Sequence, residues 1–186
     1  MAVLSAYRQK VLFLSMSTRR IFIKNSLGSL AALTIGNEAF SLTKGFSKKE
    51  KLGVALVGLG YYSTDLLAPA LQLTQYCSLK GIVTGSPDKA KKWQQQYHIP
   101  EKNIYNYQSF DSIVNNSDID VIYIVLPPSM HAQYVIKAAN AGKHVWCEKP
   151  MALTLADAEA MTAAAAKAKG QVTALGYAYL RNPALQ

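Results

Sequence analysis

Several features that mark common protein classes are scarce in this sequence. It contains only two cysteines, Cys77 and Cys147, and they do not have the spacing of a metal site. Both stand beside apolar, strand-like residues, so we expect buried thiols, with a disulfide as the alternative. No repeat or low-complexity tract interrupts the chain. Half of its residues are hydrophobic and 17% are charged, which indicates a globular chain. A length of 186 residues is enough for one sizeable domain but short for a two-domain enzyme.

The sequence also lacks a basic block with interleaved aromatic residues, although its net charge is +9. Part of that charge belongs to the first 41 residues, whose charged side chains are Arg8, Lys10, Arg19, Arg20, Lys24 and Glu38. Nucleic-acid binding is therefore not expected. A moderately basic body does suit a ligand that carries phosphate groups.

Long hydrophobic runs are absent from the N-terminal part, where residues 27–35 are too few and too polar to span a bilayer as a stable helix. They follow T-R-R-I-F-I-K, residues 18–24, which match the twin-arginine export pattern. We expect residues 1–45 to be a signal segment and linker, with a poorly formed cleavage site near residue 39. The protein would be periplasmic, carried by the twin-arginine machinery, and membrane-tethered if uncleaved. A basic amphipathic surface segment is the alternative, and Met16 is a second candidate start.

The strongest motif begins after residue 51. Residues 52–57 form an almost continuous apolar run, typical of a strand buried on both faces of a parallel sheet. The run leads into a glycine-rich turn and a helix-compatible segment, the arrangement of a dinucleotide phosphate site. Gly58 permits the tight turn, Gly60 lets backbone approach the pyrophosphate, and Ser63 replaces the usual third glycine or alanine. An ordinary tight turn is the alternative. The predicted cofactor-binding residues of this turn are Gly58, Leu59, Gly60, Tyr61, Tyr62 and Ser63.

The second predicted strand, residues 79–84, does not end in a carboxylate. In NAD-binding folds an Asp or Glu roughly 20 residues past the glycines holds the ribose 2′-hydroxyl. Here the strand leads into Thr84, Gly85 and Ser86, and Lys89 follows on a helix. Hydroxyl groups and a lysine suit the 2′-phosphate of NADP. We therefore expect NADP at these four residues, with NAD as the alternative.

Apolar runs alternate with helix-compatible segments along the rest of the chain. We expect strands at residues 52–57, 79–84, 118–126, 143–147 and 171–177, and helices at 64–75, 87–97, 109–114, 129–141 and 154–169. Ser129 and Thr154 are candidate helix N-caps, and Pro69 is an awkward residue inside the first helix. Alternation at this spacing predicts an α/β domain with a doubly wound parallel sheet, a Rossmann fold, over residues 46–178.

Ligands of such a sheet bind beyond the carboxyl ends of its strands. Lys149 is suited there to hydrogen-bond a substrate hydroxyl and help take its proton, and Glu148 to hold a ribose hydroxyl. A surface turn with a salt bridge is the alternative for this pair. His131 is either a ligand or a residue that caps its helix or faces solvent. The predicted site residues of these later loops are Leu126, Pro127, Pro128, His131, Glu148, Lys149 and Pro150.

Three motifs occur in order along the chain: V-G-L-G-Y-Y-S, V-L-P-P-S-M-H and A-G-K-H-V-W-C-E-K-P-M-A. Together they resemble the glucose–fructose oxidoreductase / inositol dehydrogenase / MocA family over residues 51–180. The Tyr61-Tyr62 pair and the leader look most like its exported branch. The resemblance implies a nicotinamide-dependent oxidoreductase that acts on a sugar or polyol and is a homo-oligomer at full length. It also implies that Lys149 is catalytic, whereas Pro128 replaces an asparagine common in close relatives.

Members of that family continue into a second domain of mixed α and β structure that covers the nicotinamide. Residues 179–186 correspond only to the start of such a domain, so we expect a truncated member. Two functions stay open: an NADP-dependent oxidoreductase present as its nucleotide-binding half, and a non-catalytic nucleotide-binding module or one that needs a separately encoded second domain.

Overall fold

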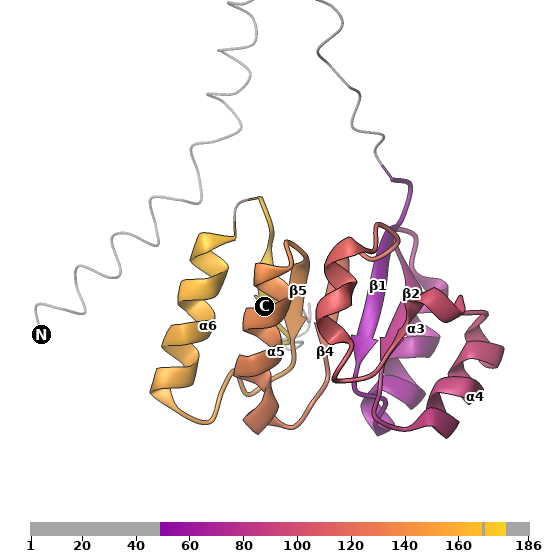
Figure 1. Ribbon diagram of the computed structural model, residues 1–186, viewed down its shortest axis with the longest axis horizontal. Coiled ribbons are helices and arrows are strands. Elements are labelled where there is room, and N and C mark those ends of the chain that lie inside the picture. Colours follow the sequence, from indigo (N-terminus) through magenta and orange to yellow (C-terminus); the bar gives the residue numbers. More distant parts are fainter. Residues whose placement is uncertain (1–48, 169, 178–186) are drawn as a thin grey trace, which may run out of the picture. The chain divides into compact units, whose positions relative to one another are not determined.

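The computed structural model describes residues 49–168 and 170–177, which form a six-stranded parallel sheet (Figure 1). Its strand order is β3-β2-β1-β4-β5-β6. The strands are β1, Leu52–Val57; β2, Cys77–Val83; β3, Ile104–Tyr105; β4, Val121–Ile124; β5, His144–Cys147; and β6, Thr173–Leu175. The winding direction reverses between β1 and β4, as in a doubly wound sheet. The predicted Rossmann architecture is confirmed.

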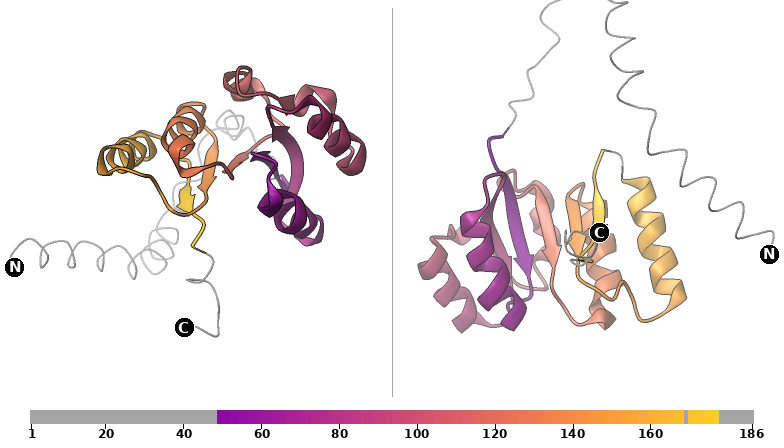
Figure 2. Two further views of the ribbon diagram at one scale, coloured as in Figure 1. Left: turned by 90° about the horizontal axis from the view of Figure 1, so that it is seen from below. Right: turned by 180° about the vertical axis from the view of Figure 1, so that it is seen from behind.

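Helices cover both faces of this sheet (Figure 2). They are η2, Tyr62–Leu67; α3, Ala68–Leu73; α4, Pro87–Tyr97; η3, Glu101–Asn103; η4, Phe110–Asn115; α5, Pro128–Asn140; and α6, Leu155–Lys167. Side chains of a strand point alternately to the two faces. Val54 and Leu56 of β1 therefore join the core beneath α3 and α4, while Ala55 and Val57 join the core beneath α5 and α6.

The helix that follows the glycine-rich turn differs from the regular α-helix expected at residues 64–75. Its first part, η2, is a π-helix, and the α-helical part, α3, ends at Leu73. Pro69 stands at the second residue of α3. Because proline has no N–H to donate to the preceding turn, the change of helix type immediately before it is a local consequence of the sequence.

The start of α5 also differs from expectation. The helix begins at Pro128, and no side chain caps it. Proline has a preset φ and needs no hydrogen bond at the first helical position, so Ser129 lies within the helix and the prediction that it caps was wrong. Thr154, by contrast, caps α6 as predicted, because its side chain accepts a hydrogen bond from the backbone N–H of Asp157.

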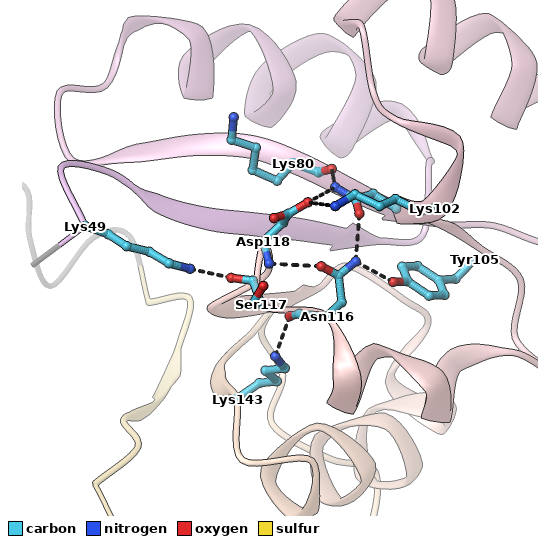
Figure 3. A network of polar contacts seen from close by, with 9 residues as sticks. Lys49, Lys80, Lys102, Tyr105, Asn116, Ser117, Asp118 and Lys143 are labelled. Atoms are coloured by element: carbon cyan, nitrogen blue, oxygen red, sulfur yellow. Dashed lines mark hydrogen bonds and ion pairs between the residues drawn. The ribbon is translucent and has the colours of Figure 1, made fainter. Parts of the chain in front are cut away.

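A polar network joins the loops at the amino ends of the strands (Figure 3). The Asn116 side-chain amide donates to the Asn103 side-chain oxygen and to the Tyr105 hydroxyl, both at 2.7 Å. Its own oxygen accepts from the Asp118 N–H at 2.9 Å. Hydrogen bonds from Lys102 and Asn103 lower the pKa of the Asp118 carboxyl. These contacts hold residues 116–120 as a loop, which explains why β4 is shorter than the predicted strand.

The buried ammonium of Lys143 belongs to the same network. It donates to the carbonyl oxygens of Asn116 at 2.8 Å and Ile119 at 2.9 Å, while burial lowers its pKa. These bonds occupy carbonyls that follow η4, the short helix before β4. The network lies opposite the carboxyl ends of the strands and so supports the sheet away from the predicted site.

Two sequence predictions fall outside the described residues: the twin-arginine segment with its cleavage region, and residues 179–186. Within the described part, no helix combines the length and apolarity needed to cross a membrane. Cys77 and Cys147 are both free thiols, and the latter is fully buried.

Candidate cofactor and substrate site

The strand register brings the predicted site segments to one edge of the sheet. Val57 at the end of β1 pairs with Val83 of β2 and Ile124 of β4, and Ile124 pairs with Cys147 of β5. These four residues end their strands in one row. The loops at residues 58–63, 84–86, 125–131 and 148–150 therefore leave the sheet side by side.

The glycine-rich turn has the backbone geometry that a phosphate site requires. Gly58 has φ +92°, and a β-carbon there would overlap the carbonyl oxygen of Val125. Only glycine suits both conditions. Gly60 is exposed, and a β-carbon added to it would meet no atom within 4 Å. Leu59 between them is buried, so the turn is held from below and open above.

Ser63 does more than fill the place of a third glycine. Its side chain is completely buried, and its hydroxyl donates to the carbonyl oxygen of Gly58 at 2.6 Å. This bond ties the start of η2 to the first residue of the turn. The sequence predicted a small residue for packing and missed this contact. Nearby, Tyr61 is exposed and Tyr62 is half-buried.

The loop after β2 connects to the glycine-rich turn through Lys89. The Thr84 hydroxyl accepts from the N–H of Ser86, and the Ser86 hydroxyl accepts from the N–H of Lys89 at the start of α4. The ammonium of Lys89 donates to the carbonyl oxygen of Leu59 at 3.1 Å. A cation therefore lies beside the predicted phosphate turn. A carboxylate, Asp88, also stands in the first turn of α4.

Glu148 is held by groups from neighbouring strands. The Tyr123 hydroxyl donates to its carboxylate at 2.5 Å, and a β-carbon at Gly176 would overlap that carboxylate. Burial and the Glu148 hydrogen bond raise the pKa of Tyr123 far above its ordinary value, with a smaller contribution from Tyr62. The ring of Tyr123 stacks on that of Trp146, with centroids 5.3 Å apart. Sequence reasoning missed Tyr123, whose signal was a polar aromatic within an apolar strand.

Lys149 and Pro150 are exposed at the same edge, and the peptide bond between them is cis. The alternative of a Glu148–Lys149 salt bridge does not hold, because the described ion pairs all lie elsewhere. Cys147, the last residue of β5, is fully buried. Burial, followed by the Glu148 charge, raises the pKa of its thiol to about 12.

His131 is fully buried in the first turn of α5, so it neither caps the helix nor faces solvent. Its Nε2 lies 2.8 Å from the carbonyl oxygen of Leu126, and its Nδ1 lies 2.9 Å from that of Pro150. The ring thus lies between the loops after β4 and β5. The other two histidines have structural places: His98 ends α4 with φ 52°, and Nδ1 of His144 accepts from the N–H of Val172.

Leu126 is buried, Pro127 is exposed and Pro128 is half-buried at the start of α5. Across residues 49–168 and 170–177, no three His, Cys, Asp or Glu side chains gather in a way that could hold a metal ion.

A glycine-rich turn at the switch point of a parallel sheet, bordered by loops with hydroxyl and ammonium groups, defines a dinucleotide-binding Rossmann domain. The family model described as "oxidoreductase family, NAD-binding Rossmann fold", GFO_IDH_MocA, matches residues 52–176. The chain belongs to this family, as its motifs predicted.

Known relatives include sugar and polyol enzymes. The solved aldose-aldose oxidoreductase of Caulobacter crescentus is 45% identical, with a TM-score of 0.69 over 71% of this chain. The scyllo-inositol dehydrogenase of Lactobacillus casei, solved with NAD(H) and scyllo-inositol, is 25% identical, with a TM-score of 0.63 over 72% of this chain. The D-xylose 1-dehydrogenase [NADP(+)] of Haloarcula marismortui is 29% identical over 130 residues, 65% of this chain.

The chain spans only part of each of these relatives. The matches cover 39% of the aldose-aldose oxidoreductase, 38% of the scyllo-inositol dehydrogenase and 36% of the D-xylose 1-dehydrogenase. The scyllo-inositol dehydrogenase was solved with NAD(H), whereas the D-xylose 1-dehydrogenase uses NADP(+), so these two enzymes share a nicotinamide cofactor but not its type.

Proposed function

We propose that this domain binds a nicotinamide dinucleotide and forms the nucleotide-binding half of an oxidoreductase that acts on a sugar or polyol. The observation that carries the proposal is the turn at Gly58–Ser63, which is closed below by Leu59 and open above Gly60. Backbone N–H groups at such a turn suit a pyrophosphate. When bound, the nicotinamide supplies the hydride acceptor or donor.

The protein's own contribution to the reaction would come from the loop after β5. Lys149 is exposed at the carboxyl edge, where its amine is suited to bind a substrate hydroxyl and share its proton. Glu148 is oriented by Tyr123 and suited to accept a hydrogen bond from a ribose hydroxyl. Efficient transfer also needs a substrate held in contact with the nicotinamide and shielded from water.

For the cofactor we propose NADP(H) in preference to NAD(H). The support is the hydroxyl-bearing loop at residues 84–86 and the Lys89 ammonium at the glycine-rich turn. A 2′-phosphate adds negative charge that these groups would attract. Asp88 is the feature that favours NAD instead, because a carboxylate can accept a bond from a free 2′-hydroxyl.

Calorimetric titration of NADPH and NADH into the same chain tests this choice. We expect NADPH to bind more tightly, and Lys89→Gln to weaken NADPH binding by about tenfold while NADH binding hardly changes. Asp88→Asn is the control and should leave the preference for NADPH in place. Equal or tighter binding of NADH by the unchanged chain contradicts the proposed preference.

The second candidate is a nucleotide-binding module that does not turn over, or that works with a separate second domain. The described residues match 39% of the aldose-aldose oxidoreductase, so the activity of that whole enzyme is a proposal for this chain. Incubation with NADP and a panel of aldoses and polyols, followed by absorbance of the reduced nicotinamide, distinguishes the two. Turnover on the order of one per second identifies an enzyme in this chain alone. Binding without turnover, restored by the second domain of a relative, identifies the module.

We propose further that the protein is exported by the twin-arginine route, on the basis of Arg19 and Arg20 in the motif at residues 18–24. Replacing both arginines with lysines keeps the charge and removes the arginine pair. We expect the variant to stay in the cytoplasm of a host with this machinery, as measured by cell fractionation. Periplasmic or membrane accumulation of the variant at the level of the unchanged chain contradicts the assignment.

A further inference from the structure

His131 joins two loops that are far apart in the sequence. Its ring is completely buried, and its two nitrogens face the carbonyl oxygens of Leu126 and Pro150 at 2.8 and 2.9 Å. A second carbonyl, that of Met151, lies 3.3 Å from Nδ1. Carbonyl oxygens only accept hydrogen bonds, so a ring nitrogen makes such a bond only when it carries the proton. A neutral imidazole has one N–H and can donate to one of these loops, whereas a doubly protonated ring can donate to both.

The loop after β5 has few other backbone bonds. Its first residue, Glu148, donates its N–H to Ile124 in continuation of the sheet, and the next regular bonds belong to α6 beyond Thr154. Pro150 has no N–H to donate. Among the described residues, the hydrogen bonds that reach the carbonyls of Pro150 and Met151 come from the His131 ring. This ring therefore supplies the hydrogen-bonding contact at the middle of the loop, beside the packing of Met151 and Ala152 against the core.

We propose that His131 is a positioning residue: its Nδ1–H donates to the Pro150 carbonyl and thereby fixes the adjacent Lys149 at the carboxyl edge of the sheet. It does not touch the cofactor itself, in contrast to the direct ligand role expected from the sequence. The proposal rests on the proposed function only for the importance of Lys149; the hydrogen bond itself is a property of the fold.

The placement of His131 explains why such a residue is needed. Lys149 follows the last residue of β5 by two positions and is exposed, so its side chain is not packed in the core. Its backbone N–H lies 3.3 Å from the carboxylate of the neighbouring Glu148. The buried ring lies between that loop and the loop after β4, with Nε2 2.8 Å from the Leu126 carbonyl oxygen, and the loop after β4 leaves the sheet next to the glycine-rich turn. Reactions of bound substrates are sensitive to displacements on the order of 1 Å, so this constraint matters for proton transfer.

Nitrogen NMR of the full chain labelled at histidine tests the bond without any cofactor. We expect the His131 resonance at Nδ1 to show a directly attached proton, with a hydrogen-bond coupling or shift that disappears in the variants below. A ring protonated only at Nε2 would overturn the proposal, because Nδ1 would then have no proton to give to Pro150.

Two substitutions separate the two ring contacts. Asparagine carries its amide N–H group near the place of Nδ1, and glutamine carries it near the place of Nε2. We expect His131→Gln to shift the backbone amide resonances of residues 149 and 151–153, and His131→Asn to leave them close to those of the unchanged chain. His98→Asn, at an exposed position, is the matched control. Equal changes in both His131 variants would point to general packing and overturn the proposal, and the ring-nitrogen measurement remains decisive if His131→Gln does not fold.

Ligand binding then tests the link to Lys149. We expect His131→Gln to weaken NADPH binding by about tenfold, and to change binding of 2′-phospho-ADP-ribose, which lacks nicotinamide, by less than about twofold. His131→Asn should resemble the unchanged chain with both ligands. Equal weakening of both ligands would indicate a purely structural residue and overturn the proposal. If the unchanged chain binds neither ligand, the proposed function fails, while NMR of the ring nitrogens and of the loop amides still decides whether His131 holds the loop.

Discussion

Two residues at the end of β5 differ in their exposure to solvent, and this difference decides which of their side chains a substrate could reach. Cys147 is fully buried, whereas Lys149 two positions later is exposed at the carboxyl edge. The nucleophile of a site must be reachable and able to lose its proton. Burial denies both to Cys147, so the thiol is a core residue, and Lys149 is the residue for which we propose a catalytic role.

The alkaline pH dependence of stability follows from this burial. Burial raises the pKa of the Cys147 thiol from the ordinary value of 9.0 to about 12. The thiol therefore contributes its full stabilisation below the unfolded value, and that contribution is lost as pH rises from 9 toward 12. We expect Cys147→Ala to flatten the fall in unfolding free energy over this range, by up to about 1.4 kcal/mol per pH unit. Urea denaturation at a series of pH values measures it.

Thiol labelling of the native chain gives an independent check on the same residue. Cys77, which is partly exposed, should be alkylated first, and Cys147 only at the rate of unfolding. Rapid labelling of both cysteines, or an unchanged alkaline slope in Cys147→Ala, would contradict the account.

The sequence was sufficient to predict at which edge of the sheet the candidate site residues lie, but not which contacts their side chains make. Apolar runs followed by Gly58–Ser63, Thr84–Ser86 and Glu148–Pro150 were enough to place these loops at the carboxyl edge. The contacts from Ser63 to Gly58 and from Tyr123 to Glu148 depend on backbone geometry and strand pairing, which local patterns do not encode. The burial of His131 likewise depends on how α5 packs against the loop after β5.

At the scale of elements, the clearest departures from the sequence occur where local rules compete. Pro69 accompanies a change from π- to α-helix, and β3 has only two residues, too few to give a periodic signal. The predicted strand from residue 118 was too long because polar side chains there bind neighbouring loops. Tertiary hydrogen bonds, absent from any local pattern, set the start of β4.

The network at the amino ends of the strands should make Asn116 important for stability. Its side chain makes three hydrogen bonds, to Asn103, Tyr105 and Asp118. Losing them in a partly buried place should lower the unfolding free energy of Asn116→Ala by about 2 kcal/mol. The neighbouring Asn115 is exposed and provides a matched control, for which we expect a change within about 0.5 kcal/mol. Similar values for the two variants in urea denaturation would show that the network adds little.

At the scale of the whole molecule, strand order and register turn four loops, separate in sequence, into one edge. Alternating strands and helices were sufficient to predict this parallel arrangement, because such connections leave few topologies. The share of the relatives that the chain spans is a different matter. The matches cover 36–39% of three known relatives, so the activity of those whole enzymes is a proposal for this chain and not a property of the fold.

The most direct test of the central claim is a calorimetric titration of NADPH into the chain and its Gly60→Val variant. A β-carbon at Gly60 would meet no atom within 4 Å beyond its chain neighbours, and the position is exposed, so we expect the variant to keep the unfolding midpoint of the unchanged chain. Its methyl groups would nevertheless occupy the space proposed for the pyrophosphate. We predict saturable binding of one NADPH per chain, weakened by roughly a hundredfold in Gly60→Val and much less in Gly60→Ala. Absence of binding by the folded, unchanged chain, or equal affinity of Gly60→Val, would contradict the account.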